Sequence, residues 1–162
     1  MLVRVIPRYL MVQLYNKHVE TGDTDAFLDG NHFISVYSTR DTSPLPGHPH
    51  VLNLMCDDLT LADMRTFTED GWNHVTLFDE NMADKTAAFI KSIPDTCNSL
   101  IIHCDAGVSR SGAIGILANR YFNKEGNADD EKFQQDSMPW LSPNPHILML
   151  LRPRLQRKET NV

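Results

Sequence analysis

One segment constrains the fold of this chain more than any other: an apolar run that ends at a cysteine and leads through a short loop into a helical pattern. Leu100 to Ile102 indicate a buried strand, Cys104 ends it, and a loop with Gly107 precedes a helix that opens at Ser111. A strand that turns sharply into a helix leaves backbone N–H groups unpaired beside the positive end of the helix dipole. Successive N–H groups in such a loop form a concavity suited to an anion. The segment therefore predicts an anion-binding loop in front of a nucleophilic side chain.

Each residue type in this segment has a chemical task. Cys104 attacks as a thiolate, and unpaired amides, a helix N-terminus and a nearby cation all favour that anion. Arg110 presents a planar guanidinium that can bind two phosphate oxygens, and Gly107 permits a positive φ. Ser111 can donate a hydrogen bond to the sulfur when the thiolate is the leaving group. His103 precedes the nucleophile on a strand and points to the opposite face, so we expect it to hold the loop rather than to act as a base. Together these roles predict hydrolysis of a phosphate monoester through a phosphocysteine.

The run from His103 to Ser111, H-C-D-A-G-V-S-R-S, resembles the signature H-C-x5-R-S/T of the cysteine-dependent protein tyrosine and dual-specificity phosphatases. The resemblance implies that Cys104 is the nucleophile of a phosphatase that needs no cofactor and no metal. It also implies a phosphate-binding loop, made of Asp105, Ala106, Gly107, Val108, Ser109 and Arg110. The partner implied is a phosphorylated protein, carrying phosphotyrosine and also phosphoserine or phosphothreonine.

A second, weaker similarity lies downstream of the signature. Ser142-Pro143-Asn144 is similar to the start of the C-terminal helix in dual-specificity phosphatases. The resemblance covers about residues 33–155, and it implies an α/β fold with a central, mostly parallel sheet and helices on both faces. The alternation of strand and helix patterns along the chain predicts the same class independently.

The periodicity of apolar residues gives the expected elements. We expect strands at 3–6, 32–38 and 50–56 and up to residue 104. We expect helices over 9–19, 60–67, 79–93, 111–122 and 146–155, with another around 129–135. Residues 72–78 are predicted to be strand-like or extended. At 162 residues the chain is most simply one domain, 1–162.

Composition argues against other classes of function. A formal charge of −6 without a block of lysine or arginine disfavours a nucleic-acid or membrane-surface role. Three cysteines are too few for a disulfide framework, and no apolar run approaches the roughly 18 residues of a membrane span. We therefore expect a cytoplasmic protein. No metal is expected either, because the histidines show no ligand spacing typical of zinc: His48, His50, His74 and His146.

The general acid that protonates the leaving oxygen is open among several aspartates. The resemblance favours Asp58, which follows the strand at 50–56 where similar proteins carry their acid. Asp58 lies 46 residues before Cys104, a longer spacing than that family usually shows, and an insertion after it would explain the difference. Asp79 has a more usual spacing but also fits as a plain N-cap of its helix. Asp57 and Asp84 complete the candidates.

Three further points stay open in the sequence. Cys56 ends the strand before Asp58, and it is either a buried spectator thiol or the partner of Cys104 in a protective disulfide. The predicted loop carries Asp105 and no lysine, which should repel substrates with additional phosphates; an RNA 5′-phosphate stays open as a substrate. A catalytically weak phosphoprotein-binding module and a rhodanese-type sulfurtransferase are the alternative functions. The Ser-Arg-Ser ending of the signature and the Pro-Asn helix start favour the phosphatase over the sulfurtransferase. The binding module is disfavoured because Cys104, Arg110 and Ser111 are all present.

Overall fold

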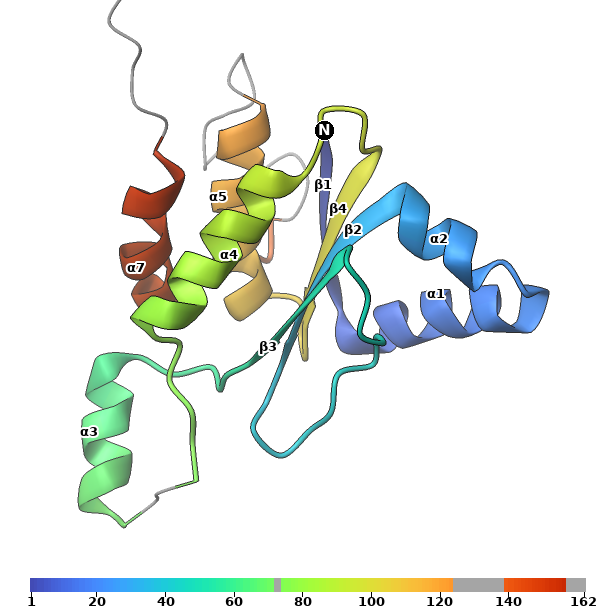
Figure 1. Cartoon of the computed structure of the whole chain (residues 1–162). Helices are drawn as coiled ribbons and strands as arrows, with labels where there is room; N and C mark the ends of the chain where they lie inside the picture. The colour runs from blue at the N-terminus through green and yellow to red at the C-terminus, as the bar shows by residue number, and fades with distance from the viewer. Residues whose placement is uncertain (72–73, 124–138, 157–162) are drawn as a thin grey trace, which may run out of the picture.

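The computed structural model describes residues 1–71, 74–123 and 139–156 (Figure 1). Its centre is a sheet of four strands in the order β1-β4-β2-β3, and every pairing is parallel. The strands are β1 (Leu2–Pro7), β2 (Asn31–Tyr37), β3 (Val51–Met55) and β4 (Ser99–Cys104). The helices of the described residues are α1 (Arg8–Thr21), α2 (Thr24–Gly30), α3 (Leu61–Glu69), α4 (Glu80–Ser92), α5 (Arg110–Phe122) and α7 (Pro145–Leu155). The predicted α/β class with a parallel sheet is confirmed.

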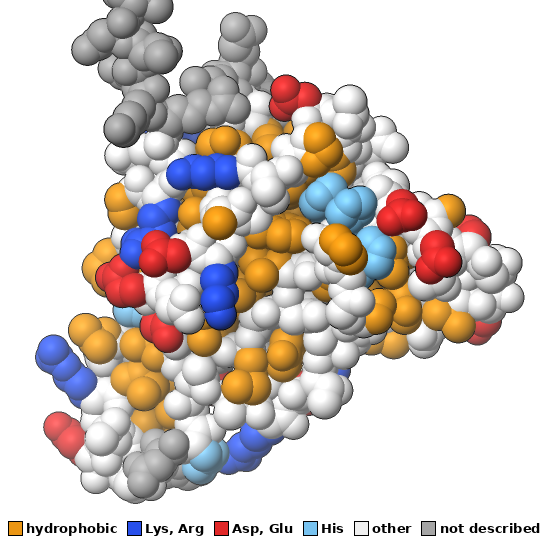
Figure 2. Space-filling view, viewed as in Figure 1, with side chains coloured by type: hydrophobic (Ala, Val, Ile, Leu, Met, Phe, Trp, Pro, Cys, Tyr) orange, Lys and Arg blue, Asp and Glu red, His pale blue; other side chains and the backbone are white. Residues whose placement is uncertain are grey.

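The helices form a layer on each side of the sheet, as predicted. Helices α1 and α2 cover one face, and α4, α5 and α7 cover the other (Figure 1). Helix α3 projects away from the sheet and has no buried residue. On the outer side of the larger layer, Arg154 of α7 pairs with Asp84 of α4 at 2.6 Å, and basic and acidic side chains are interspersed on the surface (Figure 2).

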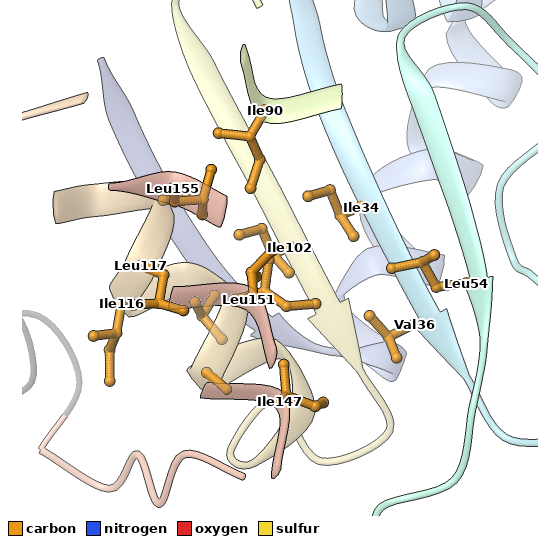
Figure 3. Close-up of a cluster of buried hydrophobic side chains, with 14 of the residues drawn as sticks. Ile34, Val36, Leu54, Ile90, Ile102, Ile116, Leu117, Ile147, Leu151 and Leu155 are labelled. Atoms are coloured by element: carbon orange, nitrogen blue, oxygen red, sulfur yellow. The ribbon is translucent and has the colours of Figure 1, made fainter. Parts of the chain in front are cut away.

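The two central strands of the sheet, β2 and β4, are buried on both faces, because helices cover each side of the parallel sheet. Successive residues of β4 point to opposite faces: Ile101 belongs to the apolar cluster under α1 and α2, whereas Ile102 belongs to the one under α4, α5 and α7. The larger cluster includes Ile34 of β2 and Ile147 and Leu151 of α7, all fully buried (Figure 3). This packing fixes the register of β4 and therefore the position of its last residue, Cys104.

Three predicted helix starts are confirmed, each with a side-chain cap. Thr60 forms a capping box with Asp63 at the start of α3. Asp79 accepts the backbone N–H of Met82 at 2.8 Å, so it is the N-cap of α4. Asn144 caps α7. Such caps satisfy N–H groups that the helix itself leaves unpaired.

The structure also differs from the predictions in local detail. Helix α2 was not predicted, because its seven residues are too short for a periodic apolar pattern. Residues 74–78 form no strand, residues 72–73 lie outside the described part of the chain, and so does the helix predicted around 129–135. The last helix agrees with the prediction, because it continues to Leu155 with Pro153 inside it. Within the described residues, no helix has both the length and the apolar character to cross a membrane.

Candidate active site

The candidate site lies at the carboxyl edge of the sheet. All four strands are parallel, so their carboxyl ends lie at one edge, which is where open α/β sheets bind ligands. Strand β4 is flanked by β1 and β2 and ends at Cys104, and α5 begins six residues later at Arg110. The predicted strand, loop and helix are thus present in this order, with the thiol directly before the loop.

Neighbouring segments hold this loop, residues 105–109, from two sides. On one side Gly107 adopts a φ of +69° and lies against β1, where a Cβ would come within 2.5 Å of the Pro7 nitrogen. The next residue, Arg8, donates its backbone N–H to the Asp105 carbonyl at 3.1 Å. On the other side the carbonyls of Val108 and Ser109 accept N–H groups of the segment before α7. The shape of the loop is therefore set by contacts far apart in the chain.

The N-terminus of α5 faces this loop without a side-chain cap. Ser109 occupies the N-cap position, but its hydroxyl makes no capping hydrogen bond and donates instead to the Asp58 carboxylate at 2.7 Å. The first N–H groups of a helix have no partner within the helix and carry the positive end of its dipole. These groups remain available for an anion, as the sequence predicted.

The thiol of Cys104 is buried and lies 2.9 Å from the Ser111 hydroxyl. Ser111 is itself fully buried on the first turn of α5. Either atom can be the donor in the neutral pair, but a thiolate can only accept. The hydroxyl is therefore placed to stabilise negative charge on the sulfur, which is the role predicted for Ser111.

The guanidinium of Arg110 is buried and fixed by three neighbours. One terminal nitrogen donates to the Cys56 carbonyl at 2.7 Å and to the Ser38 hydroxyl at 3.1 Å, and the other donates to the Asp105 carboxylate at 2.7 Å. The Nε–H has no hydrogen-bond partner within the described residues. Because a buried unpaired donor is costly, this N–H is a ready partner for an oxyanion.

Asp105 forms an ion pair with Arg110 inside the site. Burial alone would raise the pKa of Asp105, but hydrogen bonds from Arg110 and Ser38 outweigh burial and lower it. Burial likewise opposes the charge on Arg110, yet the bond to Asp105 and the negative charges nearby raise the pKa of the guanidinium. Both groups are charged at neutral pH, and the carboxylate holds the guanidinium in place.

The structure separates the candidates for the general acid. Asp58 accepts hydrogen bonds from Ser109 of the loop at 2.7 Å and from Asn144, the N-cap of α7, at 2.9 Å. Asp79 is committed to capping α4 and Asp84 pairs with Arg154. Asp58 is thus the candidate whose carboxylate contacts the loop at residues 105–109.

Asp57, the neighbouring candidate, has a different environment. Its carboxylate accepts the backbone N–H and hydroxyl of Thr39 and the N–H of Thr76, which lies 2.8 Å away. Burial favours the neutral acid, but these hydrogen bonds prevail and lower the pKa of Asp57. Because three hydrogen-bond donors keep this carboxylate ionised, Asp57 fits a structural role, in which it connects two loops, better than the role of a proton donor.

His103 contacts a neighbouring strand through its side chain, whereas the sequence predicted that it holds the loop. The ring is buried, and its Nε2 lies 2.7 Å from the Ser35 hydroxyl on β2. Burial lowers the pKa of His103 to about 4, so the ring is neutral at physiological pH. All three cysteines are free thiols; Cys56 is buried, and burial raises its pKa to about 12. Both features agree with structural rather than chemical roles for His103 and Cys56.

Sequence reasoning missed two polar residues of the site. Ser38 bonds both Arg110 and Asp105, and it directly follows β2, the strand next to β4. Asn144 was predicted only as part of a helix start, yet its amide also binds the Asp58 carboxylate. The available signal was topological, because residues that follow neighbouring parallel strands meet at the same edge.

Comparison of the sequence with protein-family models gives no match, and comparison with curated proteins gives none either. The assignment of chemistry to this site therefore rests on the geometry of the loop and on the resemblance of its signature.

Proposed function

We propose that this protein is a cysteine-dependent phosphatase of the dual-specificity type, which hydrolyses phosphate monoesters on proteins. The observation that carries the proposal is the contact of 2.9 Å between the Cys104 thiol and the Ser111 hydroxyl. These two residues and the buried guanidinium of Arg110 flank the same loop, residues 105–109. A nucleophile, a hydroxyl partner and oxyanion donors at a helix N-terminus are the parts that this chemistry requires.

The first step transfers the phosphoryl group to sulfur. The Cys104 thiolate attacks phosphorus, a sulfur–phosphorus bond forms, and the bond from phosphorus to the ester oxygen breaks. Asp58 gives its proton to the leaving oxygen. The backbone N–H groups of the loop and the Nε–H of Arg110 bind the phosphoryl oxygens, where negative charge is held in the transition state.

The second step releases phosphate. A water molecule attacks phosphorus, its proton passes to the Asp58 carboxylate, and the sulfur–phosphorus bond breaks. The electron pair returns to sulfur, and the Ser111 hydroxyl donates to the thiolate as it forms. Inorganic phosphate leaves and the starting protonation states are restored.

The proposed substrates are proteins that carry phosphotyrosine, phosphoserine or phosphothreonine. Within the loop the acidic Asp105 balances Arg110, which fits a single phosphate better than a cluster of phosphates. The proposed place of action is the cytoplasm, because the chemistry needs Cys104 as a free thiol and a reducing compartment maintains it.

The test is hydrolysis of p-nitrophenyl phosphate across pH 5 to 8 by the parent chain, Cys104→Ser and Asp58→Asn. Two matched controls use the same substitutions elsewhere: Cys97→Ser and Asp84→Asn. We expect Cys104→Ser to be inactive, Asp58→Asn to lose the basic limb of its pH profile, and both controls to match the parent.

Turnover by Cys104→Ser would refute the phosphocysteine. A parent chain that binds tungstate but releases no p-nitrophenol would instead indicate a phosphoprotein-binding module. Formation of thiocyanate from thiosulfate and cyanide, without phosphatase activity, would indicate a sulfurtransferase.

A further inference from the structure

The amino edge of the sheet, opposite the candidate active site, carries a group of side chains with the composition of a metal site. Asp29 lies near the end of α2, and His48 and His50 lie just before β3. Their ligand atoms all lie within 4.8 Å of one another. Figure 2 shows histidine side chains gathered beside acidic ones on this part of the surface. The ligand spacing that is missing along the sequence is thus present in space.

His50 is held in the way that metal-binding histidines are held. Its Nδ1 lies 3.1 Å from the Leu28 carbonyl, which can only accept, so Nδ1 carries the proton and Nε2 keeps its lone pair. The ring also stacks on that of His32, with centroids 4.3 Å apart and an interplanar angle of 21°. A hydrogen bond from the distal nitrogen that fixes tautomer and ring orientation is the usual support of a histidine ligand.

His48 completes the group with Asp29. Its Nε2 lies 3.5 Å from the Asp29 carboxylate, and its ring meets that of His50 edge-on at 5.2 Å. Its Nδ1 accepts the backbone N–H of His50 at 3.2 Å. A cation at Nε2 therefore requires the proton to move to Nδ1 and that backbone contact to open. The Asp29 side chain is 69% exposed, so a cation can reach the group from solvent.

We propose that Asp29, His48 and His50 bind Zn²⁺. Two imidazoles and one carboxylate are a ligand set that zinc accepts, with water in the fourth position of a tetrahedron, whereas Mg²⁺ and Ca²⁺ prefer oxygen ligands alone. The bound ion joins the end of α2 to the segment before β3. Because it binds the folded arrangement, Zn²⁺ stabilises the fold, and it takes no part in chemistry at the other edge of the sheet.

Another possible zinc ligand lies close by, so Zn²⁺ binding to it must be distinguished from binding at Asp29, His48 and His50. The Cys97 thiol lies 3.2 Å from Nδ1 of His32, the ring that stacks on His50. The catalytic thiol, Cys104, is a second possible ligand. The experiment therefore uses the full chain without an affinity tag and with Cys104→Ser, and it follows Zn²⁺ binding by titration calorimetry.

We expect one Zn²⁺ per chain, with the affinity lowered in Asp29→Asn and in His50→Gln by at least the about 10- to 100-fold that loss of an outer-shell partner of a metal ligand costs. Asp25→Asn removes the same charge from the same helix and should leave the affinity unchanged. Zn²⁺ should raise the melting temperature of the parent but not of Asp29→Asn. Asp29 is exposed, so this variant keeps the test decisive even if His50→Gln fails to fold.

Three results would each overturn the proposal. One is a parent chain that binds no Zn²⁺. Another is Asp29→Asn binding as tightly as the parent, and the third is binding that depends on Cys97 and is lost in Cys97→Ser.

Discussion

Replacing Gly107 by alanine tests the claim that β1 shapes the phosphate-binding loop. Gly107 adopts a φ of +69°, where side chains other than glycine are strained. An added Cβ would also lie 2.5 Å from the Pro7 nitrogen and 2.6 Å from the Ile6 carbonyl carbon. Both contacts are with backbone atoms of β1, which cannot rotate away as a side chain can. The loop or the strand must therefore move.

The expected cost has two parts. The left-handed backbone costs roughly 1–2 kcal/mol for a residue with a Cβ, and overpacking in a well-packed site costs typically 1–3 kcal/mol more. Gly22 supplies the matched control, because it has a φ of +74° and nothing within 4 Å of its added Cβ. Gly22→Ala should show the backbone cost alone, so the difference between the variants isolates the clash with β1.

Urea unfolding of both variants, followed by circular dichroism, measures the two free energies of unfolding. Activity is then compared at a temperature where both variants are folded. We expect Gly107→Ala to be the less stable variant by about 1–3 kcal/mol and to lose most of its phosphatase activity, while Gly22→Ala keeps its own. Equal destabilisation of the two variants would show that the contact with β1 does not constrain the loop.

Three more predictions follow from single contacts. Asp79→Ala removes the cap of α4. It should lower the free energy of unfolding in urea by about 0.5–2 kcal/mol and leave kcat/KM unchanged. A changed pH dependence of kcat/KM would instead indicate that Asp79 is the general acid. Ser111→Ala should retain the burst of p-nitrophenol but slow the steady state, because its hydroxyl assists the sulfur as leaving group in the second step; loss of the burst would refute this role. The folded-state pKa of His103 is about 4, below its usual 6.5, so the unfolded chain binds the proton first and stability falls as pH drops from 6.5 to 4. At 1.36 kcal/mol per pKa unit this loss is about 3 kcal/mol. His103→Gln should therefore reduce the dependence of the urea midpoint on pH in that window, and the dependence due to His32, whose pKa burial also lowers to about 4, should remain.

Features specified by neighbouring residues could be predicted from the sequence. The helices predicted to begin near residues 60 and 146 are confirmed, and both begin at local capping patterns, the capping box of Thr60 and Asp63 and the cap of Asn144. The strand predicted over 3–6 is the edge strand β1, and its last residue is Pro7, which has no N–H to donate and is tolerated at the edge of a sheet. The contact between Cys104 and Ser111 belongs to the same class, because one strand, loop and helix contain both residues.

Features that depend on chain crossovers could not be predicted. Ser38 reaches Arg110 only because β2 and β4 are neighbours in the sheet, although 72 residues separate the two. The order β1-β4-β2-β3 also brings Gly107 against β1, a contact with no trace in either local sequence. His48 and Asp29 likewise meet because the parallel strands β2 and β3 start at the same edge of the sheet, where the segments that precede them end.

The interpretation of Asp105 changes once the structure shows which side chain lies beside its carboxylate. In the sequence it is an acidic residue in a phosphate-binding loop, and its charge alone predicts repulsion of additional phosphates. In the structure its carboxylate lies 2.7 Å from the Arg110 guanidinium, so the negative charge of Asp105 is balanced by a positive charge inside the site. The donors left for an anion at this loop are the uncapped N–H groups of α5 and the unpaired Nε–H of the Arg110 guanidinium. If the chain acts on phosphate esters as proposed, its preference for a single phosphate depends on the number and orientation of these donors, which the contacts with β1 and with the segment before α7 hold in place.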